Sequence, residues 1–209
     1  AIVPNTVLRQ VRTGHLSEGK SVAAGQTGRA GIFAALLARG GMEGPHLPFE
    51  GTAGWCNHVA RKQISLDIMG GNGNPFKVQD TLIKQRACCA TTISSILAAE
   101  KVAPALKNIT DVKQVTVEVY EFAKERMATG EHHWNPDSRE TADHSIPYVT
   151  AAALMYGTVT PRQFNDAHLW NPELRALIQK IKVVTNDEFT KVYERSHVLP
   201  VVHLTRVTV

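Results

Sequence analysis

The most regular hydrophobic pattern lies near the start of the chain. Residues 26 to 39 read QTGRAGIFAALLAR, where large apolar residues recur at helical spacing with alanines between them: Ile32, Phe33, Leu36 and Leu37. Gly40 and Gly41 follow and are typical of a helix end. The pattern predicts a buried helix over this segment.

A second apolar segment, residues 88 to 102, reads CCATTISSILAAEKV and is rich in small residues that let helices approach closely. Pro104 follows and is expected to end the helix. Glycine and proline are dense between the two segments, in GMEGPHLPFEGTAGW, which predicts a long loop. The first half therefore reads as helical.

The second half changes its period. Residues 111 to 120, DVKQVTVEVY, alternate apolar and polar side chains as a half-buried strand does. A helix is predicted at roughly 146 to 156, with Ser145 as its cap and Pro147 in its first turn.

Two further helix starts are predicted where a capping side chain precedes a proline, at Thr160 and Asn171. The runs IQKIKVVTND and HLTRVTV then resemble strands, and the second would need a partner strand. This order predicts a mostly α-helical segment joined to an α+β segment near residues 104 to 110. We therefore expect two domains, 1–106 and 107–209.

Composition narrows the class of protein. The 209 residues are 43% apolar and 20% charged, which is ordinary for a globular chain with a real core. No stretch approaches the roughly 18 apolar residues that a membrane span requires, and the first residues lack the apolar centre of a signal peptide. We expect no membrane association.

Charge and cysteine content change the picture further. The net charge of +4 comes from cations spread along the chain, which favours a small anionic ligand over nucleic acid as the partner. Three cysteines are an odd number, and Cys88 and Cys89 are adjacent, where a mutual disulfide is strained. A reducing compartment is expected: the cytoplasm, or the mitochondrion in a eukaryote.

The charged run DSRETADH, residues 137 to 144, stands directly before the predicted helix at 146. Unpaired N–H groups at a helix start attract anions. Tyr148 in the first turn and His144 just before it could therefore move protons on a carboxylate-bearing substrate. The alternative is a capped helix with solvated charges, in which Tyr148 is a core residue hydrogen-bonded to the backbone.

Cations precede the two early helices. Lys20 stands ahead of a glycine-spaced stretch, and Lys84 and Arg86 stand ahead of the second helix. The alternative for Lys84 and Arg86 is that both cations are simply solvated. The alternative for the glycines is tight helix packing, and their spacing matches no phosphate-loop motif. A metal site is conceivable around five residues, but without any metal-binding spacing we expect none: His132, His133, Asp137, Asp143 and His144.

Taken together and in this order, these stretches resemble the MmgE/PrpD family. The motifs are VLRQVRTGHLSEGKSVAAGQTGRAGIFAALLARGGMEGP, then PFEG, then the K-x-x-x-C-C of residues 84 to 89, and above all NPDSRETADHSIPYVTAAALMYG. The family commonly has asparagine where Gln26 and Ala30 stand. It also has an aromatic residue and proline where this chain has Arg86 and Ala87.

The resemblance implies a partial MmgE/PrpD fold, with the α+β segment as part of the domain that the family calls the lid. It implies a homodimer that binds di- or tricarboxylates between its domains without a metal, an iron–sulfur cluster or another cofactor. By motif position, the catalytic residues would be Lys20, Lys84, Tyr148 and His144, and the substrate-binding residues Arg139, Ser145 and Gln26.

The RETADHS motif is most similar to the dehydratase branch of the family. The implied activity is a carbon–oxygen lyase that dehydrates a 2-methylcitrate-like hydroxy tricarboxylate, as in propionate catabolism. Cis-aconitate decarboxylation and iminodisuccinate epimerisation are the enzymatic alternatives, because they need the same stabilised carbanion. A non-catalytic assembly module is the alternative from another class.

Overall fold

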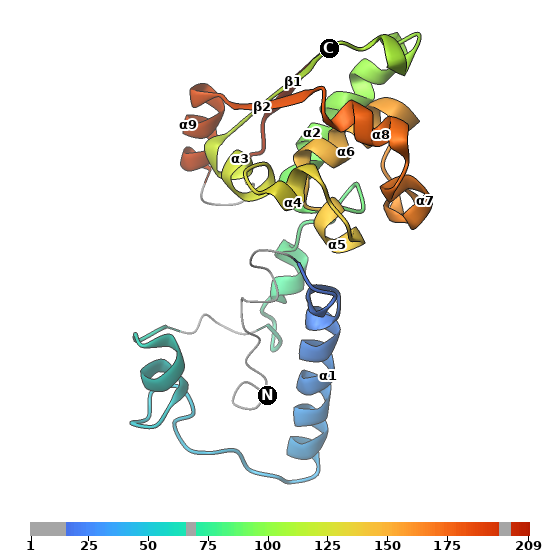
Figure 1. The fold of residues 1–209 in the computed structure, drawn as a ribbon. Coiled ribbons are helices and arrows are strands. Elements are labelled where there is room, and N and C mark those ends of the chain that lie inside the picture. Colours follow the sequence, from blue (N-terminus) through green and yellow to red (C-terminus); the bar gives the residue numbers. More distant parts are fainter. Residues whose placement is uncertain (1–15, 66–69, 197–201) are drawn as a thin grey trace. The chain divides into compact units, whose positions relative to one another are not determined.

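The computed structural model describes residues 16–65, 70–196 and 202–209, which form two compact units (Figure 1). The first unit contains residues 18–83 and the second consists mainly of residues 84–209. The division expected from the sequence at residue 106 remains a prediction about domains, whereas the compact units divide between Ile83 and Lys84.

One long helix dominates the first unit. Helix α1, Gly19–Arg39, ends where the sequence predicts, at Gly40 and a left-handed Gly41, but begins before Gln26. The expectation that it is buried is wrong for the described chain. Ile32 and Phe33 are 67% and 62% exposed. No described element packs extensively along the apolar side of α1, and only Ala23 of this helix is buried.

The glycines of α1 are not in tight contacts. A Cβ atom added at Gly25, Gly28 or Gly31 would meet nothing within 4 Å. The predicted loop, residues 41–55, consists mainly of turns and irregular segments. A short π-helix, η2 (Cys56–Ala60), and a 3₁₀ turn, η3 (Lys77–Asp80), follow it. Gly54 is required in this loop, because a Cβ there would lie 2.5 Å from the carbonyl oxygen of Phe49.

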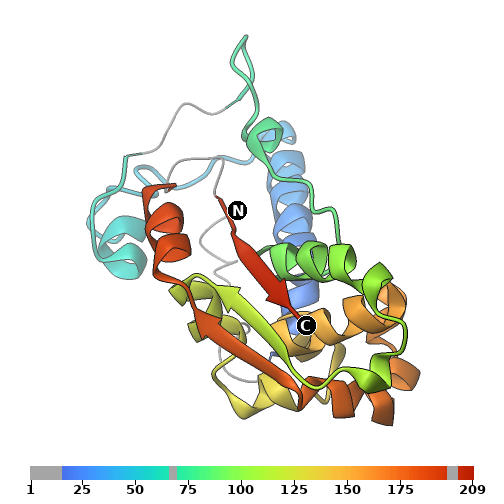
Figure 2. The ribbon, with the colours of Figure 1, turned by 90° about the horizontal axis from the view of Figure 1, so that it is seen from above.

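The second unit contains a small mixed sheet of strands β1 (Val115–Val119), β2 (Ile181–Thr185) and β3 (Thr205–Thr208). Their order is β2-β1-β3 (Figure 2), with β2 parallel and β3 antiparallel to β1. All three predicted strands are confirmed. The alternation in β1 buries its three valines against the helices and leaves Thr116 and Glu118 partly exposed.

Helices and short turns fill the rest of the second unit. They are α2 (Ala90–Val102), η4 (Ala103–Ala105), η5 (Ile109–Asp111), α3 (Glu121–Met127), α4 (Glu131–Trp134), α5 (Arg139–Ala142), α6 (Ile146–Tyr156), η6 (Pro161–Phe164), α7 (Asp166–Leu169), α8 (Pro172–Ile178) and α9 (Asp187–Arg195). The predictions of α2, α6 and α8 are confirmed, and the start at Thr160 opens the 3₁₀ turn η6.

Helix α6 forms the centre of the core. It packs against α2, α8 and β2, and nine of its eleven residues are buried. Ala151, Ala152 and Ala153 are fully buried, and their small side chains allow neighbouring helices to approach closely. The helix ends at Gly157, whose φ of 76° is a conformation that glycine adopts without strain.

The described fold is mostly helical with a small mixed sheet, as the predicted class requires, while the description of its second segment as a lid remains a prediction. Across the described ranges, no helix combines the length and the apolar character needed to cross a bilayer.

Candidate active site

The charged motif folds into two successive capped turns. Ser138 caps α5 by accepting a hydrogen bond from the Thr141 backbone, and Ser145 caps α6 by accepting one from the Tyr148 backbone. The backbone N–H of His144 donates to the carbonyl oxygen of Thr141 at 3.1 Å. These caps fix Asp143 and His144 in a tight turn immediately before a buried helix.

Ser145 is fully buried, and its hydroxyl is already engaged. It donates to the backbone carbonyl oxygen of His133 and accepts from the Tyr148 N–H at 3.0 Å. Both contacts stabilise the start of α6. The expected role of Ser145 in substrate binding remains a prediction.

Tyr148 is also fully buried. Its hydroxyl donates a hydrogen bond of 2.5 Å to the backbone carbonyl oxygen of Gln163, and its ring stacks near Phe164 with centroids 5.9 Å apart. Burial raises the pKa of Tyr148 well above its ordinary value of 10.0. This arrangement matches the core-residue alternative in its hydrogen bond to backbone. The predicted catalytic role of Tyr148 remains a prediction.

His144 has two partners on its ring. Its Nδ1 atom pairs with the carboxylate of Asp143, and the imidazole also hydrogen-bonds the thiol of Cys89. Burial opposes the charge on this ring, but the two hydrogen bonds outweigh burial and raise the pKa of His144 to about 9. The imidazole is therefore mainly protonated at neutral pH and can act as an acid.

Cys89 connects this turn to α2. It is the N-cap residue of α2, and its backbone N–H donates to the carbonyl oxygen of Asp143 at 3.0 Å. Burial disfavours the thiolate, yet hydrogen bonding to His144, the charge of His144 and hydrogen bonds from Thr91 together lower the pKa of Cys89. Sequence reasoning missed Cys89, because only the fold brings it to His144.

The same polar cluster extends towards β3. The Thr91 side chain also hydrogen-bonds Tyr120, the residue that follows β1. The Tyr120 hydroxyl forms a 2.5 Å hydrogen bond with Nδ1 of His203, which precedes β3. Burial raises the pKa of Tyr120 and lowers that of His203, so both rings are uncharged at neutral pH.

The lysine that the sequence analysis predicts in the second unit, Lys84, acts electrostatically on a residue next to this cluster. Lys84 is exposed, and its positive charge lowers the pKa of the neighbouring Cys88, although burial raises that pKa overall to about 11. Arg86, which replaces an aromatic residue of the family motif, forms two hydrogen bonds of 2.7 and 2.5 Å to Glu100. The charge of Arg86 is thereby paired.

The other three predicted residues, Lys20, Gln26 and Arg139, are exposed or partly exposed. Lys20 lies in the first turn of α1, rather than ahead of the helix, and is partly exposed. Gln26 is exposed on the same helix, in the first unit. Arg139 is exposed at the start of α5. The second unit thus brings together Cys89, Asp143 and His144, and Lys84 acts on the neighbouring Cys88.

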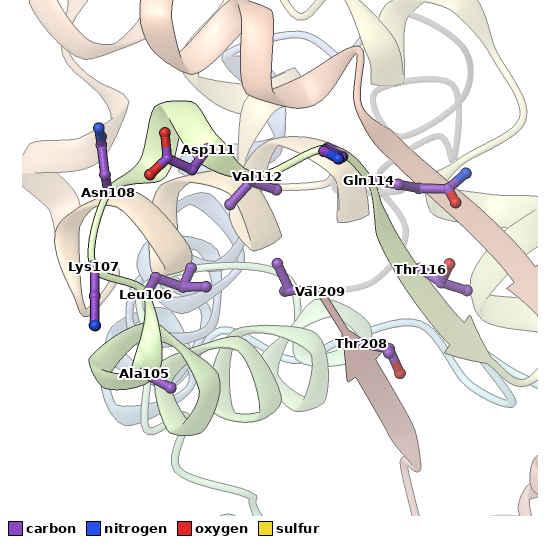
Figure 3. Close-up of a pocket in the computed structure, with 11 residues that line it drawn as sticks. Ala105, Leu106, Lys107, Asn108, Asp111, Val112, Gln114, Thr116, Thr208 and Val209 are labelled. Atoms are coloured by element: carbon purple, nitrogen blue, oxygen red, sulfur yellow. The ribbon is translucent and has the colours of Figure 1, made fainter.

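A shallow cavity of about 570 Å³ opens elsewhere in the second unit, between the segment that follows α2 and the end of β3 (Figure 3). Its labelled side chains include Lys107, Asn108 and Asp111 on the loop and Thr208 on the strand. The residues predicted from the sequence do not line it. In the parts of the chain that the structure describes, no group of three His, Cys, Asp or Glu side chains could hold a metal ion.

Comparison with known proteins identifies both parts of the chain. The family model of the MmgE/PrpD C-terminal domain matches residues 87–209, and that of the MmgE/PrpD N-terminal domain matches residues 1–66.

Two curated relatives are named for related activities. The cis-aconitate decarboxylase-like protein oryM of Aspergillus oryzae is 26% identical over 178 residues, which cover 78% of this chain and 36% of that protein. Cis-aconitate decarboxylase of Mus musculus is 38% identical over 48 residues, covering 23% of this chain and 10% of that protein. The chain thus spans about a third or less of the curated relatives it matches.

Proposed function

The chain belongs to the MmgE/PrpD family, and we propose that it serves as a lyase acting on a small di- or tricarboxylate. The observation that carries this proposal is the pairing of His144 with Asp143 and Cys89 at the start of α6. The pairing provides an acid that is charged at neutral pH, where a leaving hydroxyl group or a carbanion needs a proton.

The preferred reaction is dehydration of a hydroxy tricarboxylate similar to 2-methylcitrate. The His144 imidazolium donates its proton to the departing hydroxyl group, so that water leaves instead of hydroxide. A proton leaves the neighbouring carbon, and cationic side chains stabilise the charge that develops on the adjacent carboxylate. Lys84 is one of the proposed cations.

The base in this scheme is Lys20 rather than Tyr148. The Tyr148 hydroxyl already donates to the Gln163 carbonyl oxygen, and its raised pKa makes the phenolate costly. Arg139 and Gln26, which are exposed, are proposed to bind the outer carboxylates of the substrate.

Cis-aconitate decarboxylation is the second candidate, supported by the names of the two curated relatives. Loss of carbon dioxide leaves a carbanion beside a carboxylate, and the same imidazolium would protonate that carbon. The two reactions therefore need the same acid and differ in the bond that breaks. For either reaction, the protein is proposed to work as a homodimer. Light scattering during size-exclusion chromatography would test this by measuring the molar mass.

Proton NMR of the protein incubated separately with 2-methylcitrate and cis-aconitate tests the proposal. Dehydration yields a new unsaturated tricarboxylate, and decarboxylation yields an unsaturated dicarboxylate. His144→Gln should lower turnover by about 100-fold or more, the contribution expected of a general acid. His168→Ala removes a partly exposed histidine of the same unit, which lies outside the proposed site, and should leave turnover unchanged. Failure to bind or convert either compound would contradict the proposal.

A further inference from the structure

Three side chains around the start of α2 form a linked set that the lyase scheme uses only in part. The Cys89 thiol hydrogen-bonds the His144 imidazole, and His144 in turn pairs with the Asp143 carboxylate. The Cys89 N–H also donates to the Asp143 carbonyl oxygen at 3.0 Å, which holds the two segments together. A thiol, an imidazole and a carboxylate are thus fixed in series.

The position of Cys89 favours a negative charge on its sulfur atom. It caps the N-terminus of α2, a helix of 13 residues, where the unpaired N–H groups carry partial positive charge. The backbone and hydroxyl groups of Thr91 hydrogen-bond the sulfur as well. The imidazolium of His144 then supplies a full positive charge.

The neighbouring cysteine provides an internal contrast. Cys88 is 4% exposed, and its thiol donates weakly to the Cys89 carbonyl oxygen at 3.5 Å. Burial raises the pKa of Cys88 to about 11, whereas Cys89 is partly exposed. The third cysteine, Cys56, is 1% exposed. Accessibility and charge therefore single out Cys89.

The charged and titratable groups around the pair are few among the described residues. Asp143 hydrogen-bonds His144. The charge of Cys89 acts on Tyr120, and the charge of His144 acts on His133. Burial lowers the pKa of His133 to about 4, so this ring is neutral near pH 7. Tyr120 is likewise uncharged. Protonated His144, paired with Asp143, is thus the positive charge that acts on Cys89, and Lys84 acts on the neighbouring Cys88.

We propose that Cys89, His144 and Asp143 form a nucleophilic thiol–imidazole–carboxylate site, at which Cys89 is covalently modified by soft carbon electrophiles. With iodoacetamide, the sulfur forms a bond to the methylene carbon, the carbon–iodine bond breaks, and iodide leaves. The positive charge of His144 favours the thiolate before the attack. This site stands independently of the proposed lyase activity.

Iodoacetamide labelling followed by mass spectrometry tests the proposal. Trypsin releases residues 87–101 as one peptide that carries both Cys88 and Cys89, and fragmentation assigns the label to one of them. At pH 7, Cys89 should react at least about tenfold faster than Cys88, since the rate follows the thiolate fraction. The pH at which its rate reaches half of the maximum should be lower than that of an ordinary thiol, because the pKa of Cys89 is lowered.

His144→Ala and His144→Gln should each slow labelling of Cys89 at pH 7 by about tenfold and move its midpoint upwards, because both remove the positive charge. His168→Ala is the control and should leave the rate unchanged. Cys88→Ser leaves Cys89 as the only labelled site of the peptide, and labelling in urea should make all three wild-type cysteines equally reactive.

Equal labelling of Cys88 and Cys89 in the folded protein would overturn the proposal. The proposal would also be overturned if the pH of half-maximal labelling of Cys89 were that of an ordinary thiol and did not change in the His144 variants. Because none of these readouts requires turnover, loss of the proposed lyase activity would not affect them.

Discussion

The hydroxyl of Tyr148 donates a hydrogen bond of 2.5 Å to the backbone carbonyl oxygen of Gln163, inside the second unit. Tyr148→Phe removes this buried bond and leaves the carbonyl oxygen without that donor. We expect the free energy of unfolding to fall by about 1 to 2 kcal/mol. Tyr156→Phe is the control, because Tyr156 is only partly buried and its hydroxyl accepts a longer bond of 3.1 Å from Asn171. Urea unfolding that ranks the two variants in the opposite order would contradict this account.

The same substitution tests the catalytic role that the motif predicts for Tyr148. Together with Lys20→Ala, it should lower turnover severely, because the two residues occupy catalytic positions of the family motif. Turnover must be measured where both variants are folded, as shown by circular dichroism. Near-normal rates in both variants would rule out these two assignments.

The two histidines next to α6 should titrate at opposite ends of the pH range. Hydrogen bonds to Asp143 and Cys89 raise the pKa of His144 to about 9 against the effect of burial, whereas burial lowers the pKa of His133 to about 4. The raised pKa of His144 stabilises the fold fully below pH 6.5, and this contribution is lost as the pH rises through 9. NMR titration of the imidazole protons checks both values, and overlapping midpoints near 6.5 would contradict them.

The paired hydrogen bonds between Arg86 and Glu100 should hold the segment before α2 in place. Arg86→Ala leaves Glu100, which also accepts a bond from Thr158, without its main partner. We expect a loss of about 1 to 3 kcal/mol in the free energy of unfolding, measured in urea. The exposed Arg139 provides the control, because Arg139→Ala should have little effect on stability.

The pH dependence of this ion pair follows from Glu100. Hydrogen bonding to Arg86 is the main cause that lowers the pKa of Glu100 from 4.5, so its stabilising contribution is present above that pH and lost in acid. The difference in stability between wild type and Arg86→Ala should therefore shrink as the pH falls below 4.5. A constant difference would show that the pair contributes through packing alone.

Substitution of one isoleucine in each unit compares how much their buried packing contributes to stability. Ile96 in α2 is fully buried, and Ile96→Ala should cost about 2 to 5 kcal/mol through lost contacts and a cavity. Ile32 in α1 is 67% exposed, and Ile32→Ala should change stability by about 0.5 kcal/mol or less. A large loss at Ile32 in thermal or urea unfolding would show that α1 is covered in solution.

Much of the second unit follows from local patterns. The alternation in residues 111 to 120 gave β1, and serine or asparagine followed by proline gave the starts of α6 and α8, because capping depends on nearby residues. Helix α9 was missed. The signals for it were present: Phe189, Val192 and Tyr193 stand at helical spacing, and Asn186 before them caps the helix.

The long-range contacts could not be predicted. Cys89 and His144 are more than fifty residues apart, and only the packing of α2 against α6 brings their segments together. The sequence marked His144 through its position before a capped helix, whereas Cys89 stood in the K-x-x-x-C-C motif with no role assigned to it. Likewise, apolar spacing in α1 predicted burial, yet spacing cannot show whether another element covers that side of the helix.

The pH dependence of turnover tests the central claim, that His144 is the acid of a carboxylate lyase, most directly. With 2-methylcitrate or cis-aconitate as substrate, the wild-type rate should fall as the pH rises through about 9, where the imidazolium loses its proton. His144→Gln should be slow at every pH and lack this alkaline fall. A wild-type rate that stays constant through pH 9, or an unchanged profile in His144→Gln, would contradict the claim.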